Sequence, residues 1–217
     1  MTTIDLTHPV ADGMPVYPGD PPVTFRGHAI YQIDGYRVTG LSFGSHTGTH
    51  IDAPSHTEEH GNTLDDFPIS TFSFEAMRID CRHLGARDRI RLAEVPTATA
   101  VADVDMLVFH TGWDTHWGTD AYLDHPYLDV AVAEWCADHN LHVGIDAFSP
   151  DPTPSPNEAA GEPTDSPAHH ALLGHDCLIV ENLCNLSRVL DRFHLDAFPL
   201  SLADADGAPV RAVARFD

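Results

Sequence analysis

Short hydrophobic segments, each bounded by glycine, proline or aspartate, recur along the whole chain. Segments of this length and flanking composition are typical of β-strands, because helices need longer periodic runs. The pattern predicts strands at residues 4–6, 23–29, 37–43, 74–79, 106–110, 142–145 and 178–180. We therefore expect a strand-rich protein.

Helical periodicity is visible in fewer places. Apolar residues within 129–136 recur with helical spacing, and the segment 166–173 after Pro163 favours a short helix. A third helix is expected to begin near Asn185. So few helices among so many strands do not fit a doubly wound parallel sheet. The length of 217 residues, without an internal repeat, predicts one domain over residues 1–217.

The segment 148–167 is rich in proline, with six of them at positions 150, 152, 154, 156, 163 and 167. Proline removes a backbone donor and interrupts helices and interior strands, so this segment is expected to be a loop. It is longer than an ordinary connection, and it leads from Asp146 to His169. We expect it to cover a functional site or to contact another subunit.

The charge balance is strongly acidic, with 33 Asp and Glu against 11 Arg, no Lys, and a net charge of −22. Nucleic acids and anionic membranes are bound through basic residues, so neither is an expected partner. The hydrophobic content of 42% argues against disorder. A surface adapted to high salt, as in a halophilic organism, accounts for this composition, because salt screens the repulsion between like charges.

The sequence also bears on location. No basic and apolar leader precedes Asp5, and no stretch approaches the ~20 apolar residues of a membrane span. The four cysteines form no close-spaced motif. We expect a cytoplasmic protein with reduced thiols.

Residues 46–56, His-Thr-Gly-Thr-His-Ile-Asp-Ala-Pro-Ser-His, are chemically the most informative segment. Imidazole and carboxylate groups are ligands for Zn²⁺ and neighbouring first-row metals. On a straight strand, the Cα atoms of His46 and His50 would lie about 13 Å apart, too far to share an ion. A bend at Gly48 would bring them together, and glycine adopts it readily. The segment predicts a metal site on a kinked strand, with hydrogen-bonded structural histidines as the alternative.

The same segment matches every fixed position of His-x-Gly-Thr-His-x-Asp-x-Pro-x-His, the hallmark of the cyclase family. That family includes the bacterial metal-dependent kynurenine formamidases and the isatin hydrolases. The similarity continues at residues 5–8, 14–20, 111–113, 144–146 and 180–183. The chain therefore resembles this family nearly end to end. The resemblance implies an α/β fold of the swivelling β/β/α type, with a mixed, strand-rich sheet and few helices.

The resemblance also implies a centre with one or two divalent metal ions, Zn or Mn. It assigns His46, His50 and Asp52 to one ion. Where a second ion is present, His169 would bind it, and Asp52 and Glu181 would bridge the two. The neighbouring His170 is the alternative to His169, since a shift of one residue would exchange them.

His56 is implied to be a proton shuttle and not a ligand, a role that suits imidazole because it titrates near neutral pH. The alternative is that His56 is a fourth ligand. The implied reaction is metal-assisted hydrolysis, in which the ion acidifies a water molecule and polarises the carbonyl under attack.

The implied substrate is a small aromatic amide. Hydrolysis of N-formylkynurenine to kynurenine and formate, in tryptophan catabolism, is the first interpretation, and opening of an isatin-type cyclic amide or a lactone is the second. Tyr17 stands where the family's formamidases carry tryptophan, so it is expected to stack on the aryl ring. Trp113 and Trp117 could also line the pocket. A homodimer or higher homo-oligomer is expected.

One motif suggests a different class of enzyme. Residues 40–44, Gly-Leu-Ser-Phe-Gly, fit the nucleophile elbow of serine hydrolases. That elbow requires a helix directly after it, whereas the next residues belong to the candidate metal segment. A metallohydrolase is therefore preferred, and a non-enzymatic metal-binding protein is the remaining alternative.

The acidic composition predicts that stability depends on salt. In about 1 M KCl the Debye length falls to about 3 Å, so repulsion across the surface is largely screened. We expect the midpoint of thermal unfolding, followed by circular dichroism, to rise from low salt to molar KCl. A midpoint that does not respond to salt would contradict the halophilic interpretation.

Overall fold

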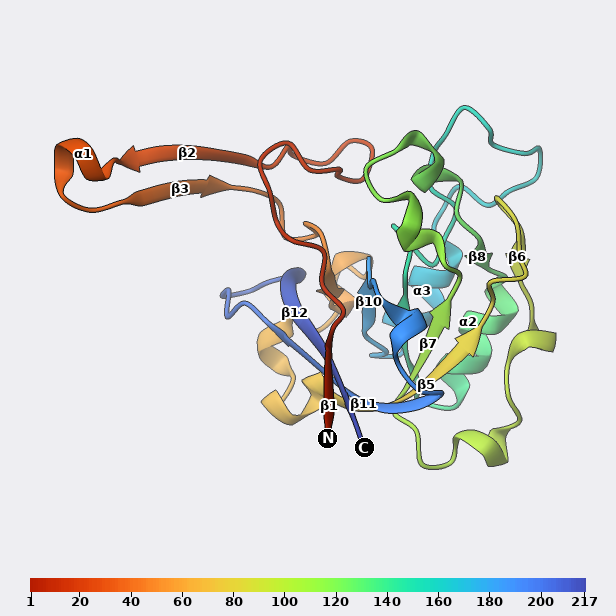
Figure 1. Cartoon of the computed structure of the whole chain (residues 1–217). Helices are drawn as coiled ribbons and strands as arrows, with labels where there is room; N and C mark the ends of the chain where they lie inside the picture. Colours follow the sequence, from red (N-terminus) through yellow and green to blue (C-terminus); the bar gives the residue numbers. More distant parts are fainter.

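The computed structural model describes all residues from 1 to 217 and has a mixed sheet of eight strands at its centre (Figure 1). In spatial order the strands are β1 (Thr2–Asp5), β12 (Gly207–Phe216), β11 (Arg192–Pro199), β5 (Ser73–Asp80), β7 (Met106–His110), β9 (His142–Ile145), β10 (Ile179–Glu181) and β4 (His50–Asp52). Strand β4 also pairs with β12. This second pairing closes the sheet into a barrel-like core.

The middle of the sheet is parallel and its flanks are antiparallel. Strands β5, β7, β9 and β10 run parallel, and helices α2 (Val130–Asp138) and α3 (Pro167–Leu173) lie in the connections between β8 and β9 and between β9 and β10. Every residue of β7 is buried. Parallel strands covered on both faces carry continuous apolar runs, which is why their limits were readable in the sequence.

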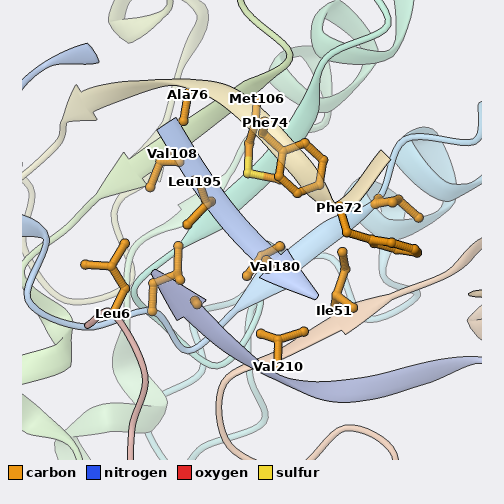
Figure 2. Close-up of a cluster of buried hydrophobic side chains, with 14 of the residues drawn as sticks. Leu6, Ile51, Phe72, Phe74, Ala76, Met106, Val108, Val180, Leu195 and Val210 are labelled. Atoms are coloured by element: carbon orange, nitrogen blue, oxygen red, sulfur yellow. The ribbon is translucent and has the colours of Figure 1, made fainter. Parts of the chain in front are cut away.

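Two hydrophobic clusters lie on opposite sides of these strands. One fills the inside of the barrel, where Ile51, Phe74, Val180, Leu195 and Val210 converge from five strands (Figure 2). The other lies between the sheet and the helices, and includes buried residues of α2 and α3. The structure thus confirms a strand-rich α/β fold with few helices.

The remaining regular elements are short. Strands β6 (Arg89–Ile90) and β8 (Tyr127–Leu128) pair with each other. Strands β2 (Thr24–Ala29) and β3 (Val38–Ser42) form a hairpin, joined by the single helical turn α1 (Tyr31–Asp34), which projects from the body (Figure 1). Single 3-10 turns occur at Pro54–His56, Leu64–Asp66, Ile69–Phe72, Leu92–Glu94, Ala98–Val101, Trp113–His116, Asp120–Asp124 and Leu186–Arg188. No helix is both long enough and apolar enough to span a membrane.

The seven predicted strands and the two predicted helices at 129–136 and 166–173 are confirmed, with limits that differ by at most two residues. The third helix near Asn185 is wrong. Asn185 has a left-handed backbone (φ 61°), and only one 3-10 turn follows it. Strands β11 and β12 were not predicted. Their inward residues alternate with polar ones or are small alanines, so they form no continuous apolar run.

Candidate metal centre

The chain bends sharply between His46 and His50, as the sequence predicted. Gly48 has a left-handed φ of 64°, and β4 begins only at His50. The bend brings the two imidazole rings to a centroid distance of 5.1 Å. A methyl group on Gly48 would lie 3.0 Å from Cε of Met14. Glycine is therefore required both for the turn and for the packing of the N-terminal segment against it.

Strand pairing places residues from distant parts of the chain beside β4. Glu181 of β10 is opposite His50, and Gly207 of β12 is opposite Asp52. Paired residues on adjacent strands project to the same face of a sheet, so Glu181 joins the group formed by His50 and Asp52. At Gly207, a methyl group would lie 2.6 Å from Cε1 of His46. The absence of a side chain there makes room for the His46 ring.

The carboxylates of Asp52 and Glu181 each lie between His50 and His169. Oδ1 of Asp52 lies 2.7 Å from Nδ1 of His46 and 3.1 Å from Nε2 of His50, while its Oδ2 lies 3.8 Å from Nε2 of His169. Oε2 of Glu181 lies 3.3 Å from Nε2 of His50, and its Oε1 lies 3.3 Å from Nε2 of His169. The donor atoms thus form two adjacent groups that share Asp52, His46–His50–Asp52 and Asp52–His169–Glu181, and a third group, His46–His56–Asp206, adjoins them at His46.

The buried oxygens of this cluster fit a metal ion. Oδ2 of Asp52 and Oε1 of Glu181 are buried and make no hydrogen bond. A buried, unsatisfied polar atom costs about 1–3 kcal/mol, and more when it is charged. Both atoms face Nε2 of His169. A divalent cation between these three atoms would satisfy both carboxylates, and imidazole with carboxylate is a donor set that suits Zn²⁺ and Mn²⁺.

The electrostatic field of the cluster favours cations. Burial lowers the pKa of His46, but the charge of Asp52 and the hydrogen bond to Asp206 outweigh it and raise the pKa to about 9. Burial also lowers the pKa of His169, whereas its hydrogen bond to Asp151 and the charge of Glu181 raise it to about 10. Positive charge is therefore stabilised at both rings. A metal ion would replace these protons, because only neutral imidazole binds metal.

Hydrogen bonds outside the cluster orient its rings. Nδ1 of His50 donates to the carbonyl oxygen of Gly48 at 2.8 Å, which leaves Nε2 facing the carboxylates. Nδ1 of His169 lies 2.7 Å from Oδ2 of Asp151, and Asp151 also accepts hydrogen bonds from the backbone N–H groups of Ala168 and His169. Such contacts fix the orientation of metal-binding imidazoles. Asp151 belongs to the proline-rich segment and was not predicted as a site residue.

The structure separates the two adjacent histidines of α3. His169 is buried and points to the carboxylates, whereas His170 is exposed and pairs with Glu58 at 2.7 Å. The alternative placement of His170 in the centre is therefore wrong.

His56 lies at the mouth of the cluster. Its ring centroid is 3.9 Å from that of His46 and 5.8 Å from that of His169. One third of its side chain is exposed, and its Nδ1 lies 3.7 Å from Oδ2 of Asp206. Asp206 also bonds Nε2 of His46 at 3.0 Å. Asp206 was not predicted as a site residue, because β12, which begins directly after it, was not predicted either. An Asp-Gly pair on its own indicates only a turn.

A pocket of about 200 Å³ opens beside the cluster and includes Tyr17 in its wall. The other lining residues are Asp20, His46, His50, His56, Thr57, Phe148, Ser149, Ser166, His169, Glu181 and Asn182. The ring of Phe148 meets that of Tyr17 edge to face at 6.3 Å. Phe148 and Ser166 lie at the two ends of the proline-rich segment. This segment therefore forms part of the pocket wall, in agreement with the expectation that it covers a functional site.

The two tryptophans lie behind this wall. Trp117 stacks on His8 with ring centroids 4.0 Å apart and packs against Tyr122. Trp113 donates its indole N–H to the carbonyl oxygen of Ala121. Neither lines the pocket, so the prediction that they could do so is wrong. Phe148 provides an aromatic surface of the pocket in their place.

The serine hydrolase motif is not part of the site. Ser42 is exposed at the end of β3 in the projecting hairpin, and no helix follows it. A nucleophile elbow needs a strand, a tight turn and a helix. The match at residues 40–44 is therefore accidental.

Comparisons with known proteins agree with this geometry. The Cyclase family model matches residues 4–152. Kynurenine formamidase from Bacillus thuringiensis (strain Al Hakam) is 31% identical over 216 residues, covering 98% of this chain and 96% of the relative. Kynurenine formamidase from Salinibacter ruber (strain DSM 13855 / M31) is 32% identical over 228 residues, covering 99% and 98%.

Solved structures show the same fold. Isatin hydrolase A from Ralstonia solanacearum superposes with a TM-score of 0.85 at 22% identity, covering 98% of this chain and 91% of that one. A predicted metal-dependent hydrolase from Bacillus stearothermophilus superposes with a TM-score of 0.76 at 27% identity, covering 98% and 97%. With the family model matching more than half of the sequence, this chain belongs to the cyclase family.

Proposed function

We propose that this chain, as a single domain over residues 1–217, is a metal-dependent amidohydrolase acting on small aromatic amides. The proposed substrate is N-formylkynurenine, cleaved to kynurenine and formate, as the names of the full-length relatives indicate. The observation that carries the proposal is the pair of buried carboxylates, Asp52 and Glu181, each within 3.8 Å of both His50 and His169, beside a pocket with aromatic side chains in its wall. A purely structural metal site would be closed on all sides, whereas this one adjoins a pocket.

His46, His50 and Asp52 are proposed to hold one divalent ion, zinc or manganese. His169 would hold a second, with Asp52 and Glu181 bridging the two. When bound, such an ion lowers the pKa of water and polarises a carbonyl group. The unpaired oxygens of Asp52 and Glu181 support the two-ion arrangement, because each carboxylate has one oxygen toward each histidine group.

His56 is proposed to transfer the proton to the departing amine. Its ring packs against that of His46 at the edge of the cluster, and one third of its side chain is exposed, so it can exchange protons with solvent. Asp206 would hold this ring and that of His46 in position, since one of its oxygens lies close to both. Tyr17 and Phe148 are proposed to hold the aryl ring against the pocket wall.

Charge in the pocket bears on the choice of substrate. No arginine lines it, and Asp20 adds a carboxylate. The ammonium group of N-formylkynurenine would find a partner in Asp20, but no arginine of the pocket wall would pair with its carboxylate. This observation keeps a second function open, namely the opening of an uncharged isatin-type cyclic amide or lactone.

A substrate panel tests the proposal. With Zn²⁺ or Mn²⁺ added to purified protein, we expect release of an aromatic amine from N-formylkynurenine or formanilide, measured by absorbance. A chelator should abolish turnover, and metal should restore it, because the ion supplies the acidified water. Turnover of isatin alone would select the second function, and turnover that survives complete metal removal would contradict both.

Ligand and shuttle variants should behave differently. His50→Ala and Asp52→Ala are expected to lower metal affinity, and with it metal content, sharply. The loss should exceed the roughly 10–100-fold loss of affinity typical when a residue that only hydrogen-bonds to a metal ligand is replaced. His56→Ala should retain the metal and lower kcat by roughly 10²–10⁴, as expected for a positioned acid–base group. Elemental mass spectrometry and steady-state kinetics measure both, with exposed His60→Ala as the histidine control. Loss of metal in His56→Ala would identify His56 as a ligand, and full occupancy in Asp52→Ala would contradict the assignment.

The stacking role of Tyr17 predicts an effect on binding. Tyr17→Ala should raise KM for an aryl amide more than it lowers kcat, because ring contact stabilises the ground state and the transition state alike. Tyr17→Trp should bind equally well or more tightly. If KM for every aryl amide is unchanged in both variants, Tyr17 does not contact the substrate.

A further inference from the structure

Asn182 directly follows the candidate metal ligand Glu181 and lines the same pocket. Successive residues of a strand point to opposite faces, so a longer β10 would turn Asn182 away from Glu181. Instead the strand ends at Glu181, and Asn182 has a left-handed backbone with φ 55°. This conformation is uncommon outside glycine, and asparagine is among the residues that adopt it most readily. The change of direction brings both side chains to one pocket.

Three hydrogen bonds hold Asn182 in this conformation. Its backbone N–H donates to the carbonyl oxygen of Ala147 at 2.9 Å, and its own carbonyl oxygen accepts from Oγ1 of Thr49 at 2.6 Å. Its side-chain Oδ1 accepts from the hydroxyl of Tyr122 at 3.0 Å. The position of the amide group is therefore set by three other segments of the chain.

Tyr122 determines which end of this amide faces the pocket. The side chain of Tyr122 is fully buried, and its phenol, which is protonated at neutral pH, needs an acceptor. That acceptor is Oδ1 of Asn182. The NH2 group then points the other way, because Nδ2 makes no hydrogen bond within the chain and is not sealed from solvent. Asn182 thus presents a hydrogen-bond donor to the pocket.

This donor lies between the two parts of the site. On one side is its chain neighbour Glu181, within the cluster of carboxylates and histidines. On the other side is Phe148, which is proposed to hold the aryl ring. Phe148 follows Ala147, the backbone partner of Asn182, and meets the Tyr122 ring edge to face at 4.6 Å. The amide link of an aryl amide would span the same interval, and its carbonyl oxygen is the acceptor that it offers.

We propose that Nδ2 of Asn182 donates a hydrogen bond to the carbonyl oxygen of the amide that is cleaved, and that Tyr122 is the positioning residue that holds this donor. The inference rests on the proposed amidohydrolase function. Negative charge develops on the carbonyl oxygen when the carbonyl carbon is attacked, so a fixed donor at this place stabilises the transition state more than the bound substrate.

Steady-state kinetics with formanilide test the donor. Asn182→Gly removes the amide and suits the left-handed backbone. It should lower kcat at least about 10-fold and change KM less, since removal of one such donor costs up to roughly 10²–10³ in kcat. Metal content, measured by elemental mass spectrometry, should stay at the wild-type level. An unchanged kcat, or loss of metal together with activity, would overturn the inference.

Tyr122→Phe separates positioning from general packing. It removes only the hydroxyl, so the amide is free to rotate, and kcat should fall roughly 2–10-fold, as for one neutral hydrogen bond. In Asn182→Gly the same substitution should have no further effect, because the donor that it positions is gone. A hydroxyl with a purely structural role would lower kcat by the same factor in both backgrounds, and that result would contradict the inference.

The matched control for Tyr122→Phe is Tyr127→Phe. Tyr127 is also buried, but its hydroxyl accepts from Nε of Arg89 and lies outside the pocket. Its kcat should equal that of the wild type. Circular dichroism shows whether each variant is folded.

Equilibrium binding tests the donor without turnover. Acetanilide carries the carbonyl oxygen, whereas N-ethylaniline has a CH2 group in its place. By isothermal titration calorimetry with metal-loaded protein, Asn182→Gly should weaken the binding of acetanilide roughly 2–10-fold and leave that of N-ethylaniline unchanged. Equal effects on both ligands, or no effect on acetanilide, would overturn the inference. A wild type that binds acetanilide through Asn182 but hydrolyses no amide would support the hydrogen bond and contradict only the proposed function.

Discussion

Two negative charges buried at one seam of the sheet are the constraint on which this structure depends. Asp52 and Glu181 are both almost inaccessible to solvent and lie on neighbouring strands. Burying a carboxylate is very unfavourable unless it is paired. Three histidine rings surround them, and their raised pKa values show how strongly this position attracts positive charge. A divalent ion would supply positive charge to the same two carboxylates. Metal binding and stability of the fold should therefore be coupled.

The seam is also where the barrel closes. Strand β4 lies between β10 and β12, and each of the three strands brings part of the site. Strand β4 carries His50 and Asp52, β10 ends at Glu181, and β12 begins at Gly207, directly after Asp206. A slip of one residue in either pairing would turn these side chains to the opposite face. Closing the sheet and assembling the centre are therefore the same event.

Two segments lie outside the sheet and the helices that cover it: the proline-rich loop at residues 148–167 and the β2–β3 hairpin. The proline-rich loop is held to the body by Arg87, which pairs with Glu162 and Asp124 and donates to the carbonyl oxygen of Thr153. Its anchored ends supply Phe148 to the pocket and Asp151 to His169. The loop was expected either to cover the site or to contact another subunit. Its contacts within the chain support the first of these roles. The projecting β2–β3 hairpin packs little against the body, and most of its large apolar side chains are exposed.

The sequence determined the features that depend on neighbours along the chain. The histidine spacing with Gly48 defined the bend, and continuous apolar runs defined strands such as β7 and β9. What it left undecided depends on pairing between distant segments. The choice between His169 and His170 follows from how α3 is capped and packed, and Asp206 and Gly207 matter only because β12 closes against β4. Strands β11 and β12 were missed because alternating or small residues give a weak local signal, and their burial arises only once the barrel is formed.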